Sequence, residues 1–183
     1  DHGSEVLDLQ DPQAIASAVD RIGEERGIDI LINNAGFGMV DLVEEQSVEG
    51  WNRTQDVNLR APWLMAKAAF PYLKASGRGR VINIASQAGV IALLEHAAYG
   101  ASKAGLINLT KVMAVEWARY GITANAISPT VVESPMALIG WSGEKGVQAR
   151  REIPVGRFAR PAEIAAAALY LCSEDAAIVT GEN

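Results

Sequence analysis

The sequence predicts an α/β fold in which one doubly wound parallel sheet forms a single domain. Short apolar runs alternate with amphipathic helical stretches along the 183 residues. The apolar runs are nearly continuous in valine, isoleucine and leucine, which is typical of parallel strands covered on both faces. Strands that alternate with helices indicate a sheet with helices on both sides. We therefore expect ligands to bind beyond the carboxyl ends of the strands.

Four strands are expected from the apolar runs. They are Glu5–Leu9, Ile28–Asn33, Arg80–Ala85 and Ile122–Ser128. The sequence shows no glycine-rich phosphate loop between a first strand and a first helix. It also stops at Thr180–Asn183, where another strand is expected. We interpret residues 1–183 as a domain that lacks its opening βαβ unit and its closing strand.

Four helical stretches have readable start and stop signals. The first begins with an N-capping aspartate and a proline at the first helical position, and a glycine follows its end. Similar signals bound the others. The expected stretches are Pro12–Arg26, Ser47–Ala75, Ala98–Tyr120 and Pro161–Ser173. Pro62 lies inside the second stretch and has no N–H to donate to the carbonyl of Asn58, so a kink is expected there.

Composition excludes several classes of function. With 49% hydrophobic and 21% charged residues, the chain is an ordinary globular domain. Its net charge of −6 argues against a nucleic-acid surface, which requires clustered lysine and arginine. The longest apolar run, Ile164–Cys172, is too short to cross a membrane. A single cysteine, expected to be buried, suits a reducing cytoplasm.

Tyr99 and Lys103 are four residues apart in a predicted helix, so their side chains share one face. A free phenol has a pKa near 10. An ammonium about 4 Å away contributes roughly 4 kcal/mol at an effective dielectric near 20, which is about three pKa units. We therefore expect Lys103 to lower the pKa of Tyr99 far enough for Tyr99 to act as a general base.

Two further polar residues are candidates for the same site. Ser86 ends a predicted strand, where its hydroxyl can hold a substrate oxygen or, alternatively, cap a turn. Asn58 lies inside a helical stretch, where asparagine is disfavoured and usually faces solvent. Because Pro62 frees the Asn58 carbonyl, we expect that carbonyl to hold a water that connects Lys103 to solvent.

Five motifs, in their order and spacing, resemble those of the short-chain dehydrogenase/reductase family. They are Asn33-Asn34-Ala35-Gly36, Val57-Asn58-Leu59, Ile82-Asn83-Ile84-Ala85-Ser86, Tyr99-Gly100-Ala101-Ser102-Lys103 and Asn125-Ala126-Ile127-Ser128-Pro129. The resemblance covers essentially the whole chain. It implies a Rossmann fold and an oxidoreductase that transfers a hydride between a secondary alcohol and NAD or NADP. The cofactor supplies the hydride chemistry, and the protein supplies position and electrostatics.

The resemblance also implies roles for individual residues. Tyr99 is the acid/base, Ser86 positions the reacting oxygen, Lys103 holds the nicotinamide ribose, and Asn58 holds the relay water. The implied cofactor-binding residues are Asp8, Leu9, Asn34, Ala35, Gly36, Tyr99, Lys103, Pro129, Val132 and Ser134. Thr130 replaces the usual glycine of this family, so the backbone there must avoid positive φ. NAD is the expected cofactor and NADP the alternative, because the discriminating segment is absent. No metal is expected.

Two motifs are similar to a subgroup that oxidises small polyols such as threitol, glycerol-like diols or galactitol. They are Ser128-Pro129-Thr130-Val131-Val132 and Ser86-Gln87-Ala88-Gly89-Val90-Ile91-Ala92-Leu93. The substrate-binding candidates are Ser86, Gln87, His96 and Trp141. Gln87 and His96 could equally be loop residues bonded to backbone. Glycines around Trp141 suit a mobile lid over about residues 135–154, with a surface loop and a core tryptophan as the alternative.

Family members pair two helices between subunits, usually in a tetramer, so the resemblance implies a homo-oligomer joined through Ala61–Ala75 and Ala98–Tyr120. Two rival functions remain open. A ketoreductase of 3-oxoacyl thioesters or other carbonyls would be favoured by a basic patch near the site. A non-catalytic nicotinamide-binding subunit would be favoured by loss of Tyr99 or Lys103, and both are present.

Overall fold

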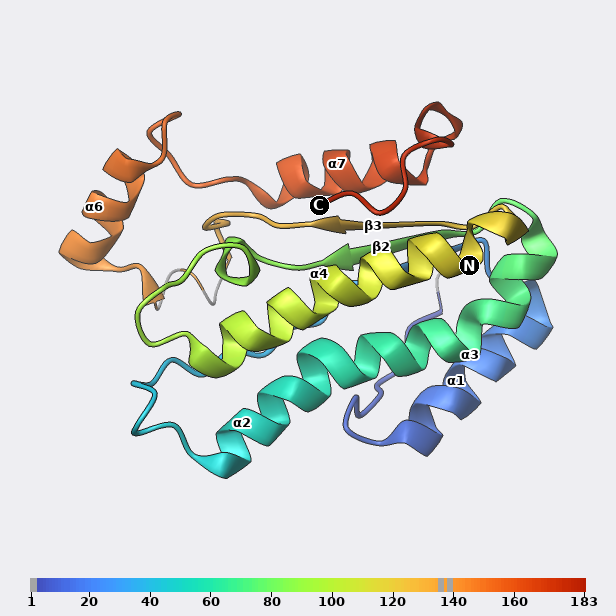
Figure 1. Cartoon of the computed structure of the whole chain (residues 1–183), viewed down its shortest axis with the longest axis horizontal. Helices are drawn as coiled ribbons and strands as arrows, with labels where there is room; N and C mark the ends of the chain where they lie inside the picture. The colour runs from blue at the N-terminus through green and yellow to red at the C-terminus, as the bar shows by residue number, and fades with distance from the viewer. Residues whose placement is uncertain (1–2, 135–136, 138–139) are drawn as a thin grey trace.

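The structure is a computed structural model that describes residues 3–134, 137 and 140–183. Its sheet is parallel and has the order β1-β2-β3 (Figure 1). The strands are β1 (Ile30–Asn33), β2 (Arg80–Ile84) and β3 (Thr123–Ile127). Three of the four predicted strands are therefore confirmed, each shorter than predicted by one or two residues.

The predicted strand at Glu5–Leu9 is wrong, because residues 3–8 have no regular structure. A strand is stable only where a neighbour takes its backbone hydrogen bonds, and none of the described strands pairs with this segment. The other end of the chain does pair. Gly181 N–H donates to Ala124 O at 2.8 Å, and Ala126 N–H donates to Glu182 O at 2.8 Å. The last residues thus run along β3, where the closing strand was expected.

Three of the four helical predictions hold almost as written. They are α1 (Pro12–Arg26), α4 (Ala97–Trp117), which continues as a 3₁₀ turn over Ala118–Tyr120, and α7 (Pro161–Cys172). The Asp11 carboxylate caps α1 by accepting from the N–H groups of Gln13 and Ala14. This cap satisfies two of the donors that a helix start leaves free.

The second helical stretch is distorted where the proline predicts it. It consists of α2 (Val48–Gln55), a π-helical turn over Asp56–Arg60 and α3 (Ala61–Ser76). In that turn Ala61 N–H donates to Asp56 O, five residues back. Pro62 cannot donate a helical hydrogen bond, and a π-turn is one of the recognised ways to absorb such a break. The turn places Asn58 at its centre.

The segment predicted as a glycine-rich loop contains a helix, α6 (Gly143–Glu152). Residues 135–136 and 138–139 of that segment lie outside the described residues. The loop prediction gave too much weight to the glycines. Most residues of Glu144–Glu152 have good helix propensity, and only Gly143 of this helix adopts a positive φ, of 62°. The helix extends from the edge of the sheet where the strands end (Figure 1).

Helices cover both faces of the sheet, as a doubly wound fold requires. In Figure 1, α3 and α4 lie on one face and α7 on the other, while α1 packs against α3. The main core lies between the sheet and α3 and α4. It contains Val19, Leu31, Ala66, Ala69, Leu73, Val81, Met113, Ala114, Ile122 and Ala124. In the described part of the chain no helix has the length and apolarity needed to span a membrane.

Candidate active site

Tyr99 and Lys103 lie in the first two turns of α4, beside the carboxyl end of β2. The Lys103 side chain is buried, and its Nζ donates to the Ile84 carbonyl at 2.7 Å. Burial lowers the pKa of Lys103 from 10.5 to about 8. The ammonium is therefore held at the end of the strand, 5.8 Å from the centre of the Tyr99 ring.

The pKa of Tyr99 is raised by burial, and the Ser86 hydroxyl lowers it only in part. We expected Lys103 to lower the pKa of Tyr99, but it has no resolved effect on that pKa. Lys103 directs its charge to the Ile84 carbonyl rather than to the phenol oxygen. Desolvation of the phenolate therefore outweighs the favourable contacts.

Ser86 caps a turn, as one of its two expected functions requires, and it also lies beside Tyr99. Its hydroxyl accepts from Ala88 N–H at 3.2 Å and so caps the 3₁₀ turn Gln87–Gly89. The same hydroxyl contacts the Tyr99 phenol. The turn packs tightly on α4: a Cβ added at Gly89 would lie 2.7 Å from the Lys103 backbone. Glycine at position 89 thus allows Ser86 and Tyr99 to approach each other.

Asn58 is fully buried, so the solvent-facing alternative is wrong. Its Oδ1 accepts from Phe37 N–H at 2.8 Å, and its Nδ2 donates to Phe37 O at 2.7 Å. Nδ2 also donates to Ser102 Oγ at 3.0 Å. One side chain therefore joins the π-turn, the loop after β1 and helix α4. The sequence argument considered only the Asn58 backbone and missed this role of the carboxamide.

Two glycines place side-chain-free backbone next to the buried ammonium and the phenol. A Cβ at Gly36 would lie 3.7 Å from Lys103 Nζ, and a Cβ at Gly38 would lie 3.4 Å from Tyr99 Cδ2. Asn34, Ala35 and Gly36 are exposed along this edge. A side-chain-free backbone beside a cation and a phenol fits the ribose and nicotinamide of a dinucleotide. These residues therefore fit the cofactor that the motifs imply.

Buried asparagines form a second set of contacts, for which the sequence argument gave no role. Asn33 Nδ2 donates to Asn83 Oδ1 at 2.8 Å, and Asn83 Nδ2 donates to Thr110 Oγ1 at 2.8 Å. Asn125 Nδ2 donates to Val179 O at 2.8 Å. These bonds fix the strands to each other, to α4 and to the chain end. Asparagine is disfavoured in strands, so its occurrence in three of them was the available signal.

The structure separates the predicted substrate residues. The His96 ring meets the Tyr99 ring edge to face at 6.1 Å, and its Nδ1 is 2.6 Å from Leu94 O. Gln87 N–H donates to Pro129 O at 2.9 Å. Trp141 is only half-buried beside Lys145, so it is not a core residue. No contact in the described part of the chain brings Trp141 to Tyr99.

The remaining predicted cofactor residues lie on two segments. Pro129, Val132 and Ser134 follow β3, and Val132 forms a bridge with Ala159. Thr130 avoids positive φ as expected, since Glu95 alone among the described non-glycine residues has one. Asp8 and Leu9 belong to the irregular first segment, where the Asp8 carboxylate accepts from Gln10 N–H. Their role stays a prediction. The described residues contain no cluster of metal-ligating side chains.

Comparison with known proteins agrees with this geometry. The family model described as Enoyl-(acyl carrier protein) reductase matches residues 3–183. The chain is 46% identical over 156 residues to an NAD-dependent glycerol dehydrogenase of Listeria innocua, covering 85% of this chain and 61% of the relative. It is 41% identical over 183 residues to a D-threitol dehydrogenase of Mycolicibacterium smegmatis, covering all of this chain and 70% of the relative.

The fold has close structural counterparts as well. The structure of an NAD⁺-bound xylitol dehydrogenase superposes with a TM-score of 0.93 at 28% identity, covering 98% of this chain and 76% of that one. The chain thus spans about three fifths to three quarters of the proteins that it matches. The family match over nearly all residues agrees with the arrangement of Ser86, Tyr99 and Lys103. The chain therefore belongs to the short-chain dehydrogenase/reductase family.

Proposed function

We propose that this chain carries the active site of an NAD-dependent dehydrogenase that moves a hydride between a secondary alcohol and nicotinamide. The observation that carries the proposal is the placement of Tyr99 between Ser86 and Lys103 at the carboxyl edge of the sheet. The side-chain-free backbone of Gly36 and Gly38 next to Lys103 and Tyr99 also supports the proposal. NAD is favoured because the similar glycerol dehydrogenase is NAD-dependent. NADP is the alternative cofactor.

In the proposed oxidation, Tyr99 takes the proton of the substrate hydroxyl. Ser86 donates a hydrogen bond to the same oxygen and holds it beside the phenol. When bound, the nicotinamide ring accepts the hydride. Burial alone makes Tyr99 a weak acid, so positive charge near the phenolate is essential. The Lys103 ammonium is the charge that the chain provides.

The proton that reaches Tyr99 has to leave the buried site. We infer that the Asn58 carbonyl holds a water that relays it from Lys103 toward solvent. The π-turn at Asp56–Arg60 favours this route, because it removes the regular hydrogen-bond pattern around that carbonyl. A high-resolution crystal structure tests it. An Asn58 carbonyl bonded only to protein would eliminate the route.

A small polyol is the proposed substrate. The two relatives described above act on glycerol and D-threitol, as their names state. His96 is the best-placed residue to bind a second hydroxyl, because its ring touches the Tyr99 ring. Gln87 and Trp141 remain candidates for further contacts, Trp141 as part of a lid over about residues 135–154.

Initial rates test the proposal directly. The intact protein is assayed with NAD and with NADP on glycerol, D-threitol, xylitol and 2-propanol. We expect NAD-dependent oxidation of at least one polyol, faster than that of the mono-alcohol. Binding of NAD without turnover of any alcohol would instead favour the non-catalytic nicotinamide-binding subunit.

One observation favours a second function, reduction of 3-oxoacyl thioesters. Helix α6 carries exposed basic residues, Lys145, Arg150 and Arg151, in a protein that is acidic as a whole. Such a surface suits the phosphates of an acyl carrier. Reduction of acetoacetyl-CoA with NADH or NADPH, at a rate above that of polyol oxidation, would make this the main activity.

We also infer a homo-oligomer, proposed as a tetramer, joined through α3 and α4. Trp63, Val112 and Val115 on these helices are substantially exposed. A shallow hollow of about 370 Å³ beside them is lined by Gln55, Asp56, Leu59, Arg60, Trp63 and Leu109. Burial of such side chains stabilises an interface. Light scattering tests it, and a monomer at micromolar concentration would contradict it.

A cytoplasmic location is proposed from the single Cys172, which is not in a disulfide.

A further inference from the structure

Two buried polar atoms at the amino ends of β2 and β3 have no hydrogen-bond partner. They are Arg80 Nε and Thr123 Oγ1. Both residues are more than nine-tenths buried, with exposed fractions of 4% and 6%. Buried polar atoms are nearly always bonded, so each exception requires an explanation, such as strain, a water or an ion. These two atoms lie at the amino ends of neighbouring strands.

The two residues are neighbours in the sheet. Arg80 and Thr123 are register partners in the sheet, so their side chains project from the same face. They also share a neighbour: Gly79 O accepts from Arg80 Nη1 at 3.1 Å and from Thr123 N–H at 3.0 Å. The guanidinium and Thr123 are therefore adjacent across one carbonyl oxygen.

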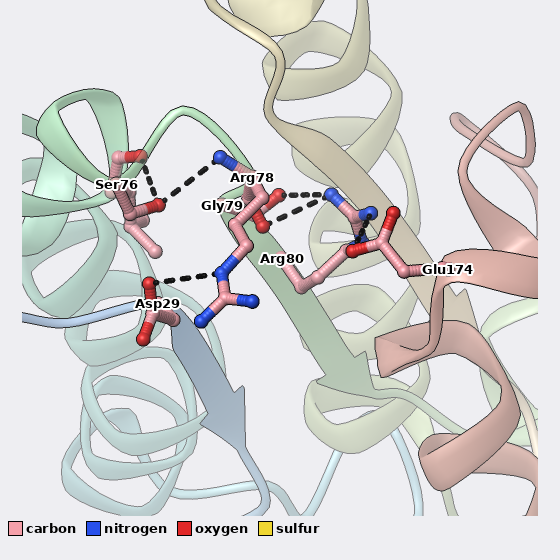
Figure 2. A network of polar contacts seen from close by, with 7 residues as sticks. Asp29, Ser76, Arg78, Gly79, Arg80 and Glu174 are labelled. Atoms are coloured by element: carbon pink, nitrogen blue, oxygen red, sulfur yellow. Dashed lines mark hydrogen bonds and ion pairs between the residues drawn. The ribbon is translucent and has the colours of Figure 1, made fainter.

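Only some of the N–H groups of the Arg80 guanidinium have a hydrogen-bond acceptor among the described residues (Figure 2). Its Nη1 is satisfied by the carbonyls of Arg78 and Gly79. Its Nε–Nη2 edge, which can bind an oxyanion through two parallel hydrogen bonds, meets only Glu174. The Glu174 carboxylate is 3.8 Å from Nη2, beyond hydrogen-bond range, and its side chain is 77% exposed. The buried guanidinium is therefore paired at long range with a carboxylate that is largely solvated.

Arg78, two residues before Arg80, differs from it in being exposed to solvent. Its side chain is 66% exposed and pairs with the exposed Asp29 at 3.6 Å (Figure 2). Water solvates both charges there, so no further partner is required. The same argument does not apply to Arg80, whose side chain is 5% exposed. Arg78 is therefore stabilised by solvent, whereas the buried Arg80 requires a counter-charge from the protein or from a ligand.

We propose that Arg80 and Thr123 form a binding site for a small oxyanion, such as sulfate, phosphate or a free carboxylate. Its oxygens accept from Arg80 Nε and Nη2 and from the Thr123 hydroxyl. Because Nε–H only donates, the missing partner has to be an acceptor. A water would accept the hydrogen bond but leave the charge uncompensated. The exposed Glu174 carboxylate lies next to Arg80 Nη2 and competes with the anion for the guanidinium. The site is at the sheet edge opposite Tyr99 and does not depend on the proposed activity.

A sulfate titration of the full chain tests the proposal. The midpoint of thermal unfolding is measured against sulfate at constant ionic strength, with sodium chloride as balance. We expect a saturable rise in the parent chain. Thr123→Val should raise the half-saturating sulfate concentration at least about tenfold, the effect of one hydrogen bond to a charged group. Glu174→Gln should lower it at least about fivefold, because a like charge at about 4 Å is removed.

Arg78→Gln is the matched control and should leave the half-saturating concentration unchanged. Arg80→Gln should abolish the saturable rise. If that variant does not fold, Thr123→Val still decides, since valine has nearly the shape of threonine. A rise that is linear in sulfate and equal in all variants would be a general salt effect and would overturn the site. A saturable rise that Thr123→Val leaves unchanged would place the anion elsewhere and overturn it too.

A crystal grown in selenate distinguishes a free oxyanion at Arg80 from the protein's own Glu174 carboxylate. Anomalous density within hydrogen-bond distance of Arg80 Nε and Thr123 Oγ1 would support the proposal. A water at that position, or the Glu174 carboxylate turned onto the Nε–Nη2 edge in the presence of selenate, would overturn it.

Discussion

The two edges of this sheet hold their polar side chains in different ways. At the carboxyl edge, neutral amides make the contacts: Asn58 alone forms three hydrogen bonds to two other elements. At the amino edge, charged residues dominate, and the pairs of Arg78 with Asp29 and of Arg80 with Glu174 are long and largely exposed on at least one side. Both edges contain a buried cation, Lys103 in the first and Arg80 in the second.

The difference shows how an active site can be rigid and yet reactive. Buried amides satisfy their neighbours without adding charge, and Lys103, 5.8 Å from the centre of the Tyr99 ring, is the buried cation at this edge. Exposed ion pairs are screened by solvent and fix little. Polar networks that are fully bonded specify one arrangement. The carboxyl edge is therefore held in one arrangement, and we expect the amino edge to tolerate change except at Arg80.

The largest effect is expected at Tyr99. Tyr99→Phe should lower kcat by about 10²-fold or more, because the general acid/base is lost. NAD affinity should hardly change. Tyr120→Phe, at the far end of the same helical region, is the control and should keep nearly full activity. Initial rates of NADH formation and NAD titrations provide the measurement. Activity of Tyr99→Phe within a few-fold of the parent would remove Tyr99 from this role.

Asn58→Ala should have the next largest effect, on stability. It removes the hydrogen bonds that the Phe37 N–H, the Phe37 carbonyl and the Ser102 hydroxyl make with Asn58, at about 1–3 kcal/mol for each buried group left unpaired. We expect the free energy of unfolding in urea to fall by about 3–5 kcal/mol. The exposed Asn52→Ala in α2 is the control, with a change below about 1 kcal/mol. Equal losses for both variants would show that the amide contacts do not stabilise the carboxyl edge.

Lys103 should make stability depend on pH in a narrow window. Its pKa is about 8 in the folded chain and 10.5 ordinarily. Between these values the unfolded chain retains a proton that the folded chain has lost, so the free energy of unfolding rises with pH from about 8 to about 10.5. The rise is about 3 kcal/mol at most. Lys103→Met should remove it, whereas the exposed Lys111→Met should not.

The smallest effects are expected at the amino edge. Asp29→Asn should change the free energy of unfolding by less than about 0.5 kcal/mol, because both partners are exposed. Glu174→Gln should cost more, about 1 kcal/mol, since Arg80 is buried and loses its nearest counter-charge. Urea unfolding at low salt measures both. A larger loss for Asp29→Asn than for Glu174→Gln would reverse the contrast between the two arginines.

Local sequence patterns were sufficient to predict most of the helices and strands. Continuous apolar runs predicted β1, β2 and β3, and the proline and glycine at the ends of α1 predicted its bounds. Pro62 predicted a distortion that the structure shows as a π-turn. The strand at Glu5–Leu9 failed because a strand requires a neighbour, which no local pattern contains. The helix at Gly143–Glu152, inside the lid or loop expected over about residues 135–154, was missed because glycines were given more weight than the helix-forming residues between them.

By itself, the sequence predicted three strands and four helical stretches in their order and indicated Ser86, Tyr99 and Lys103 as candidates for one site, because motif spacing and helical periodicity are properties of the chain. Only the tertiary structure decided that the Asn58 carboxamide binds the Phe37 backbone, and that Lys103 reaches Ile84 rather than the Tyr99 oxygen. Only the tertiary structure buried Arg80 next to Thr123. Hydrogen-bond partners and desolvation depend on which segments meet in space, and residues far apart in the chain supply them.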